Sequence, residues 1–141
     1  MDQLLVVGAL GLVGRAVLRH FESMPQWRLT GLSRRQPDFP TRCEMLSVDL
    51  RDPGACEAAA GSLSGVTHIV YCANSEETSL LSGWLQKDHV ETNVAMLRNL
   101  MEPLRTSARG LRHVTLLQGR RRTGRRRGRS RSLRRRMIRA P

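Results

Sequence analysis

Short apolar runs alternate with amphipathic stretches through the first 117 residues of the chain. The run at 4–7 is wholly apolar and ends at a glycine, which is typical of a strand buried on both faces of a parallel sheet. Residues 14–24 carry apolar side chains at helical spacing, and Pro25 ends the predicted helix. These two stretches predict a buried strand followed by an amphipathic helix.

The same alternation continues to the fifth predicted strand. Strands are predicted at 28–33, 44–48, 67–72 and 112–117, and helices at 52–61 and 83–104. The first of these helices begins with Asp52 as a cap and Pro53 in its first turn. Because strand and helix alternate, the sequence predicts an α/β fold of the Rossmann type. We expect a truncated, doubly wound parallel sheet in the order 3-2-1-4-5, with the glycine loop where the order reverses.

The first strand runs directly into GALGLVG, with glycines at positions 8, 11 and 14. The first glycine permits a tight turn, the second lets a pyrophosphate approach the backbone, and the third lets the helix pack closely. The helix N-terminus offers unpaired N–H groups to the phosphates. The motif therefore predicts a dinucleotide site, with a glycine-rich turn that binds nothing as the alternative. Its candidate contacts are Gly8, Leu10, Gly11, Leu12, Val13 and Gly14.

The end of the second strand indicates which dinucleotide binds. A site for NAD usually has an Asp or Glu here, about 20 residues after the glycines, that binds the ribose 2′-hydroxyl. This chain has Ser33, Arg34 and Arg35 instead, with no carboxylate. A hydroxyl and two guanidinium groups suit a 2′-phosphate, so the sequence predicts NADP. The alternative is that both arginines are solvated loop charges.

Three further candidates follow the third and fourth strands. Asp49 comes directly after the third strand and can accept a hydrogen bond from an adenine amino group, or serve only as a turn residue or cap. Leu50 adjoins it. Ala73 ends the fourth strand, where small residues leave room for a cofactor at the carboxyl edge of the sheet. Asn93, inside the last helix, is either a helix-to-loop brace or an exposed residue.

The formal net charge of +12 is unevenly distributed. Twelve of the 24 basic residues lie between 118 and 141, and none of the 12 acidic residues does, so residues 1–117 are neutral. A uniformly basic nucleic-acid-binding domain would not divide this way. The excess charge belongs to the C-terminal segment alone.

The remaining reactive side chains are scattered. The three cysteines form no C-x-x-C pair and the histidines show no ligand spacing, so we expect no metal site and mostly buried free thiols in a reducing compartment. No apolar run approaches the roughly 20 residues that span a bilayer. The N-terminus lacks the basic start and small-residue cleavage site of a signal peptide. We expect a cytoplasmic protein with no membrane partner.

Taken in order, these motifs resemble those of the extended short-chain dehydrogenase/reductases, in the branch that includes progesterone 5β-reductase and iridoid synthase. The matching stretches read GALGLVG, SRR, VDL, THIVY and NVAMLRN, and they cover residues 4–119. The resemblance implies an NAD(P)-binding Rossmann domain at 1–119. It also implies an oxidoreductase that uses NADPH to reduce a small carbonyl or enone substrate.

The chain departs from this family after the fifth strand. The family has T-G-x-K-x-Y-G there, with a catalytic lysine, and a tyrosine farther on that donates a proton or stabilises the enolate. This chain has Gln118 and Gly119 followed by arginine, with no lysine after Lys87 and no tyrosine after Tyr71. The substrate-binding half of the family's fold is also missing. We therefore expect a catalytically incomplete protein with no catalytic residues of its own.

Two interpretations of residues 120–141 remain. With a free choice of synonymous codons, 119–124 can be read in a shifted frame as Pro-Lys-Ala-Tyr-Gly, which fits the missing motif, so we favour an out-of-frame tail. The alternative is a Rossmann-fold binding protein whose arginine-rich arm binds nucleic acid or anionic surfaces non-specifically. The tail has no aromatic residue for stacking on bases, so we expect no specific nucleic-acid partner. Its few apolar residues predict disorder.

Overall fold

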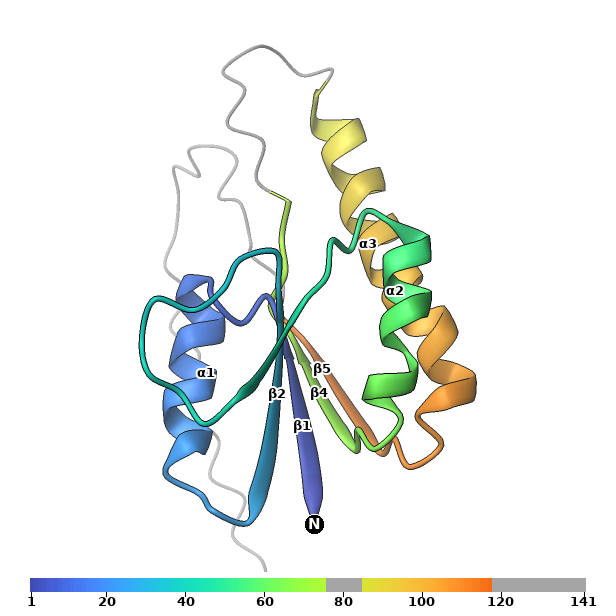
Figure 1. Ribbon diagram of the computed structural model, residues 1–141. Helices are drawn as coiled ribbons and strands as arrows, with labels where there is room; N and C mark the ends of the chain where they lie inside the picture. The colour runs from blue at the N-terminus through green and yellow to red at the C-terminus, as the bar shows by residue number, and fades with distance from the viewer. Residues whose placement is uncertain (76–84, 118–141) are drawn as a thin grey trace, which may run out of the picture.

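The computed structural model describes residues 1–75 and 85–117 and consists of a parallel sheet between two layers of helices (Figure 1). The strands are β1 (Asp2–Val7), β2 (Trp27–Ser33), β3 (Glu44–Ser47), β4 (His68–Tyr71) and β5 (His113–Leu116). The helices are α1 (Leu12–Glu22), α2 (Pro53–Ala59) and α3 (Leu85–Ser107), with a short 3₁₀ turn at Gly61–Leu63. The prediction for 120–141 lies outside the described residues.

The sheet has the predicted topology. Its strand order is β3-β2-β1-β4-β5, and all four neighbouring pairs are parallel. Figure 1 shows α1 on one side of the sheet and α2 and α3 on the other. The strand order reverses between β1 and β4, so the loop after β1 lies at the carboxyl edge of the sheet where the order reverses. The prediction of a doubly wound Rossmann-type fold is therefore confirmed.

The wholly apolar end of the central strand serves both faces of the sheet. Side chains of a strand alternate between the two faces. Leu5 and Val7 belong to the cluster under α2 and α3, whereas Leu4 and Val6 belong to the cluster under α1. All four are at most 2% exposed. Each face of β1 therefore contributes to a hydrophobic core, and a polar residue in this run would be buried without water.

The helices begin and end near the predicted positions, with one clear difference. Asp52 caps α2 by accepting hydrogen bonds from Gly54 N and Ala55 N, as the sequence predicts. α3, however, passes through Pro103 to Ser107, beyond the predicted end at 104. Proline removes one helical hydrogen bond, which normally ends a helix. Leu104 beyond the proline is fully buried in the core, and its burial offsets that loss.

The loop between β2 and β3 is fastened to α1 by Arg42. Its guanidinium donates to the carbonyl oxygens of Phe21, Glu22 and Met24 at the C-terminal end of α1, at 2.8–3.0 Å. It also donates to Trp27 O at the start of β2, at 2.9 Å. A cation is favoured at the negative end of a helix dipole, where the last carbonyl groups have no helical partner. Arg42 therefore closes α1 and anchors the far end of the loop.

We expect Arg42→Ala to lower the free energy of unfolding by about 1–2 kcal/mol, because the carbonyl groups at the end of α1 lose a charged donor. Urea denaturation followed by circular dichroism measures the change. Arg42→Lys should recover only part of the loss, since an ammonium group has fewer N–H donors than a guanidinium and cannot donate to all four carbonyl oxygens at once. Arg109→Ala, in the exposed turn after α3, is the matched control and should be neutral. An equal loss in both alanine variants would contradict the anchoring role.

None of the helices in the described ranges is long and apolar enough to cross a bilayer. The cytoplasmic location remains a prediction.

Candidate functional site

The turn after β1 requires glycine at position 8. Gly8 has a φ of +78°, in the left-handed region that favours glycine. A Cβ at this position would lie 2.8 Å from both Cα and N of Ala73, at the end of β4. The peptide N–H groups of Gly8 and Ala9 both donate to Leu32 O of β2, at 3.0 Å. The loop is therefore held between the ends of β2 and β4, and the predicted contact residue Ala73 lies against it.

The other two glycines of the motif differ from each other in their surroundings. A Cβ on Gly14 would lie 2.1 Å from Gly8 O and 2.8 Å from Cα of Ala9, so α1 packs directly on the turn. Among the described residues, a Cβ on Gly11 would meet only Gly8 O, at an ordinary 3.4 Å. Packing inside the protein thus explains Gly8 and Gly14 but does not explain Gly11. Gly11 leaves its backbone open on the exposed side of the loop.

The N-terminus of α1 is suited to an anion. Gly11 is the N-cap residue and provides no side-chain cap, and the first turn contains no acidic residue. The N–H groups of this turn therefore have no helical acceptor, and the positive end of the helix dipole is not neutralised. Leu12 and Val13 project from this turn and are 90% and 48% exposed, whereas Leu10 is 5% exposed. Two of the three predicted apolar contacts are thus accessible to a ligand.

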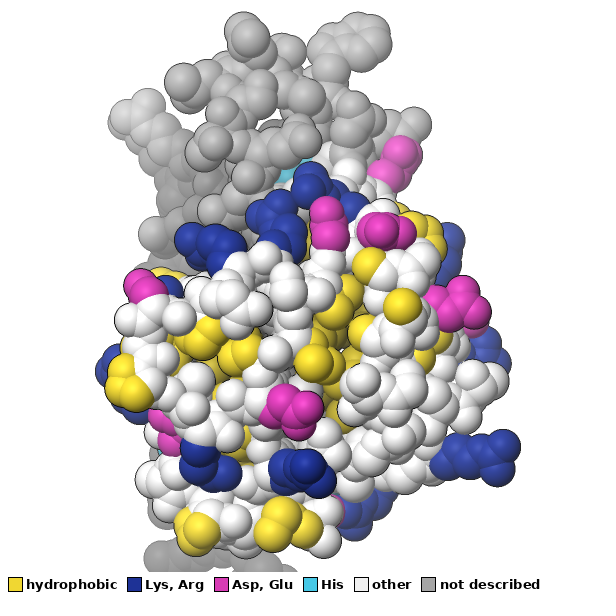
Figure 2. All heavy atoms as spheres, viewed as in Figure 1, with side chains coloured by type: hydrophobic (Ala, Val, Ile, Leu, Met, Phe, Trp, Pro, Cys, Tyr) yellow, Lys and Arg dark blue, Asp and Glu magenta, His cyan; other side chains and the backbone are white. Residues whose placement is uncertain are grey.

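The three residues predicted to select NADP lie together at the end of β2. The Ser33 hydroxyl accepts a hydrogen bond from Arg35 N at 3.3 Å, which shapes the turn. Arg34 and Arg35 are exposed, and no acidic side chain within 1–75 and 89–117 forms an ion pair with either. Figure 2 shows Lys and Arg side chains gathered along the upper edge of the described part, where the strands end in Figure 1. An anion at the N-terminus of α1 would be the first anion bound, and the end of β2 offers positive charge to a second one.

Asp49 is a turn residue in the structure, which was one of its two predicted roles. Its Oδ1 accepts Arg51 N at 3.0 Å, and its carboxylate forms an ion pair with the Arg51 side chain at 3.2 Å. The hydrogen bonds from Arg51, with a smaller contribution from the charge of Arg34, lower the pKa of Asp49. The carboxylate is half-exposed, so it keeps acceptor capacity toward solvent. The other predicted role, as an adenine contact, stays open.

Leu50 is placed differently from the other candidates. Its side chain is 6% exposed and belongs to the core under α2 and α3. Only its backbone can therefore meet a ligand. Its carbonyl oxygen accepts a hydrogen bond from Asn99 Nδ2 of α3 at 2.9 Å, a contact that the sequence did not indicate. Asn99 thus fixes the turn that presents Asp49.

Asn93 is a brace, which was one of its two predicted roles. Its Oδ1 accepts Ser75 N at 2.8 Å, and its Nδ2 donates to His89 O at 2.8 Å. The bond to Ser75 ties α3 to the segment that follows β4. Asn93 therefore positions the backbone just beyond Ala73.

The buried titratable groups offer no nucleophile. Cys43 and Cys56 are buried and Cys72 is half-buried, and all three are free thiols. Burial raises the pKa of each, that of Cys43 to about 12. Burial likewise raises the pKa of Tyr71 to about 12, and its hydroxyl has no hydrogen-bond partner in the described part of the chain. These groups stay protonated at neutral pH, and Cys43, Cys56 and Tyr71 belong to the hydrophobic core. The described residues contain no cluster of three or more metal-ligating side chains.

Comparison with known proteins identifies the family. The model of the NAD dependent epimerase/dehydratase family matches residues 4–119. The chain belongs to this family. The match runs from β1 past the end of β5, so the glycine loop and the ends of β2, β3 and β4 all lie inside the matched region. The sequence-based prediction of a short-chain dehydrogenase/reductase relationship is confirmed.

Curated members of the family include enzymes of the predicted branch. The chain is 30% identical over 124 residues to an (S)-8-oxocitronellyl enol synthase of Nepeta racemosa, and 27% identical over 127 residues to the 3-oxo-Δ4,5-steroid 5β-reductase of Arabidopsis thaliana. Each match covers 82% of this chain and 30% of the relative. The chain therefore spans less than a third of the length of these family members.

Solved structures of family relatives share the fold. A short-chain dehydrogenase/reductase superfamily protein of Agrobacterium tumefaciens with bound NAD matches with a TM-score of 0.62 at 23% identity, over 82% of this chain and 32% of that one. A variant of uronate dehydrogenase from the same organism, complexed with NAD, matches with a TM-score of 0.57 at 26% identity, over 82% and 40% of the two chains. None of these relatives has a name that refers to nucleic-acid binding, so they give no support to the alternative of a nucleic-acid-binding protein.

Proposed function

We propose that this chain binds NADP and is the dinucleotide-binding part of an oxidoreductase that acts on carbonyl or enone substrates. The observation that carries the proposal is Gly11, whose missing side chain leaves the backbone open above uncapped N–H groups. Gly8 and Gly14 hold the loop in place, and Gly11 keeps it accessible. A pyrophosphate fits such a loop, because it needs close backbone approach and N–H donors.

Residues 1–119 form the NAD(P)-binding unit in this proposal, and residues 120–141 are separate from it. The pyrophosphate would meet the first turn of α1 between Gly8 and Val13. Leu12 and Val13, both exposed, would cover apolar parts of the cofactor. Asp49 would accept a hydrogen bond from the adenine amino group with the acceptor capacity that Arg51 leaves. The backbone of Leu50 would lie beside the ring, and Ala73 would leave room for the cofactor at the end of β4.

The choice of NADP over NAD rests on the end of β2. Arg34 and Arg35, which directly follow Ser33, are exposed, and a guanidinium can hold a phosphate in bidentate fashion. A carboxylate that would bind a 2′-hydroxyl and repel a 2′-phosphate is missing from this stretch.

The names of two relatives support the proposed substrate class. Two of them are named as an enol synthase and as a reductase of 3-oxo-Δ4,5-steroids, so an enone or carbonyl compound is the proposed substrate of the intact protein. The nicotinamide ring, when bound, supplies or accepts a hydride. This chain's own residues bind and orient the dinucleotide. They contain no lysine after Lys87 and no tyrosine after Tyr71 that could handle a proton.

Charge reversal at Arg34 tests the proposal. Arg34→Glu should raise the dissociation constant for NADP about 100-fold, because a bidentate cation is replaced by a carboxylate that repels the 2′-phosphate. The dissociation constant for NAD should stay within about twofold, since NAD lacks that phosphate. Isothermal titration calorimetry with both dinucleotides measures the two constants.

Arg109→Glu makes the same change of charge in the turn after α3 and serves as the control. It should leave both constants unchanged at physiological salt. Equal losses of NADP and NAD affinity in Arg34→Glu would contradict the assignment of the 2′-phosphate site.

A further inference from the structure

The side chain of Arg15 connects the glycine loop with the loop that follows β2. Its Nε donates to Leu10 O in the glycine loop, at 2.9 Å. Its terminal nitrogen lies 3.2 Å from a carboxylate oxygen of Asp38, and its guanidinium carbon lies 5.0 Å from the centroid of the Phe39 ring. One guanidinium group therefore touches two segments that are separated by more than 20 residues along the chain.

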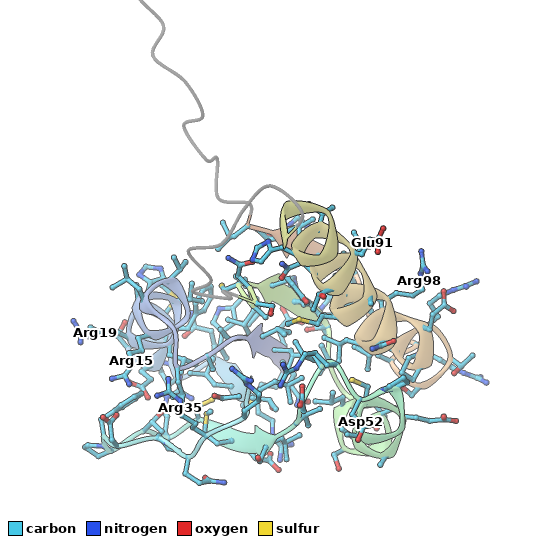
Figure 3. The ribbon with its side chains drawn as sticks, turned by 90° about the horizontal axis from the view of Figure 1, so that it is seen from above. Arg15, Arg19, Arg35, Asp52, Glu91 and Arg98 are labelled. Carbon is cyan, nitrogen blue, oxygen red and sulfur yellow. The ribbon has the colours of Figure 1, made fainter. Side chains whose placement is uncertain are left out.

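Asp38 and Phe39 lie in the loop that begins with Arg34 and Arg35. Arg42 anchors the far end of this loop on the C-terminal carbonyls of α1. Arg15 holds the middle of the same loop from the first turns of α1. Figure 3 shows Arg15 and Arg35 on the same side of the molecule, well away from Glu91 and Arg98 of α3. The start of the loop is held by Ser47 of β3, whose hydroxyl donates to Arg34 O at 3.3 Å, whereas its middle and far end are held by α1.

We propose that Arg15 is a positioning residue for the 2′-phosphate site. It fastens the middle of the loop to the glycine loop and so fixes Arg34 and Arg35 relative to the bound pyrophosphate. This inference rests on the proposed function, because it concerns the same NADP site. A 2′-phosphate and a pyrophosphate belong to one ligand, so the two loops that hold them must keep a fixed separation.

The contacts of Arg15 favour positioning over direct binding of the phosphate. Its guanidinium already donates to a carbonyl oxygen, pairs with a carboxylate and stacks near an aromatic ring. The negative charge of Asp38 lies against it and reduces its pull on another anion. If Arg15 bound the phosphate directly, Asp38 would be a competitor for its guanidinium. If Arg15 positions the loop, Asp38 is its partner. The two roles therefore predict opposite effects of removing Asp38.

The experiment compares Arg15→Ala, Asp38→Ala and the double variant in the full chain. Dissociation constants for NADP and NAD are measured by calorimetry, and thermal unfolding reports stability. Arg19→Ala, one helical turn farther along α1, removes the same charge from an exposed position and is the matched control. Because the Arg15–Asp38 pair is exposed, with 41% and 77% of the side chains accessible, the melting temperature should change little in any variant.

We expect Arg15→Ala to weaken NADP binding about tenfold and leave NAD binding within about twofold. Asp38→Ala should weaken NADP binding about threefold, although losing a carboxylate near a phosphate would by itself strengthen it. The double variant should bind NADP as tightly as Arg15→Ala alone, because both single changes break the same contact, the ion pair between Arg15 and Asp38.

An unchanged or improved NADP affinity in Asp38→Ala would overturn the positioning role. So would equal losses of NADP and NAD affinity in Arg15→Ala, which would show a general structural role, or the same loss in Arg19→Ala, which would show an effect of net charge. A starting protein that binds NADP and NAD equally would overturn both this inference and the proposed NADP preference. A starting protein that prefers NADP, with Arg15→Ala unchanged, would overturn the inference alone.

Discussion

Gly14→Ala is expected to destabilise the fold by at least about 3 kcal/mol, a large part of the total stability of a small domain. The added Cβ would lie 2.1 Å from Gly8 O and 2.8 Å from the Cα of Ala9, and the three atoms nearest to it are all backbone atoms. No side chain can move aside, so α1 must shift away from the turn. That shift would open the core beneath Leu18, which is 1% exposed. Chemical denaturation at equilibrium measures the loss.

Gly11→Ala is the matched control, because it makes the same change three residues earlier in the motif. Within the described part of the chain its Cβ meets only Gly8 O, at 3.4 Å, so stability should change by less than about 0.5 kcal/mol. Affinity for NADP should nevertheless fall at least about tenfold, since the methyl group would project where the pyrophosphate approaches. A stable Gly14→Ala protein would contradict the packing role of that glycine. Full affinity in a folded Gly11→Ala protein would contradict the proposed cofactor site.

The sequence predicted the features that depend on local pattern. The apolar run before Gly8, the spacing of the glycines and the Asp52–Pro53 helix start each act within a few residues, and each has the expected structure. The strand order also follows from simple rules, because right-handed crossovers between parallel strands leave few alternatives. Together these were enough to place the loop at the carboxyl edge, where the order reverses.

The sequence could not predict contacts between distant residues. In the sequence, Arg42 is one charged residue of a polar loop and Arg15 is one charged residue of an amphipathic helix. Their partners are known only once α1 and the loop after β2 are packed together. Likewise, the apolar pattern predicts the last helix only as far as residue 104, and the structure shows that α3 continues to Ser107, beyond the buried Leu104. For Leu50 the motif indicates a position near the cofactor, and only the packing of α3 shows that the side chain faces the core.

The 141-residue chain is expected to show no reductase turnover, which is the largest of the predicted effects. Holding two reactants in a reactive geometry can lower a barrier by about 7–11 kcal/mol, and the described residues offer positions for the dinucleotide alone. Proton transfer would also lack its groups, because no lysine follows Lys87 and no tyrosine follows Tyr71. Loss of NADPH absorbance with an enone substrate should therefore not exceed the rate without protein, even though we expect NADPH to bind.

The comparison that decides this point changes the gene after Gly119. If the reading frame is shifted there so that Pro-Lys-Ala-Tyr-Gly replaces 120–124 and a long open frame follows, the repaired protein should oxidise NADPH with an enone. Its lysine and a later tyrosine would then stabilise the developing oxyanion, which requires donors that are held in place before the reaction. A stop codon soon after the shift would contradict the out-of-frame tail. Turnover by the 141-residue chain would show that some other group handles the proton. The proposal that this chain binds the dinucleotide without catalysing the reaction would then be wrong.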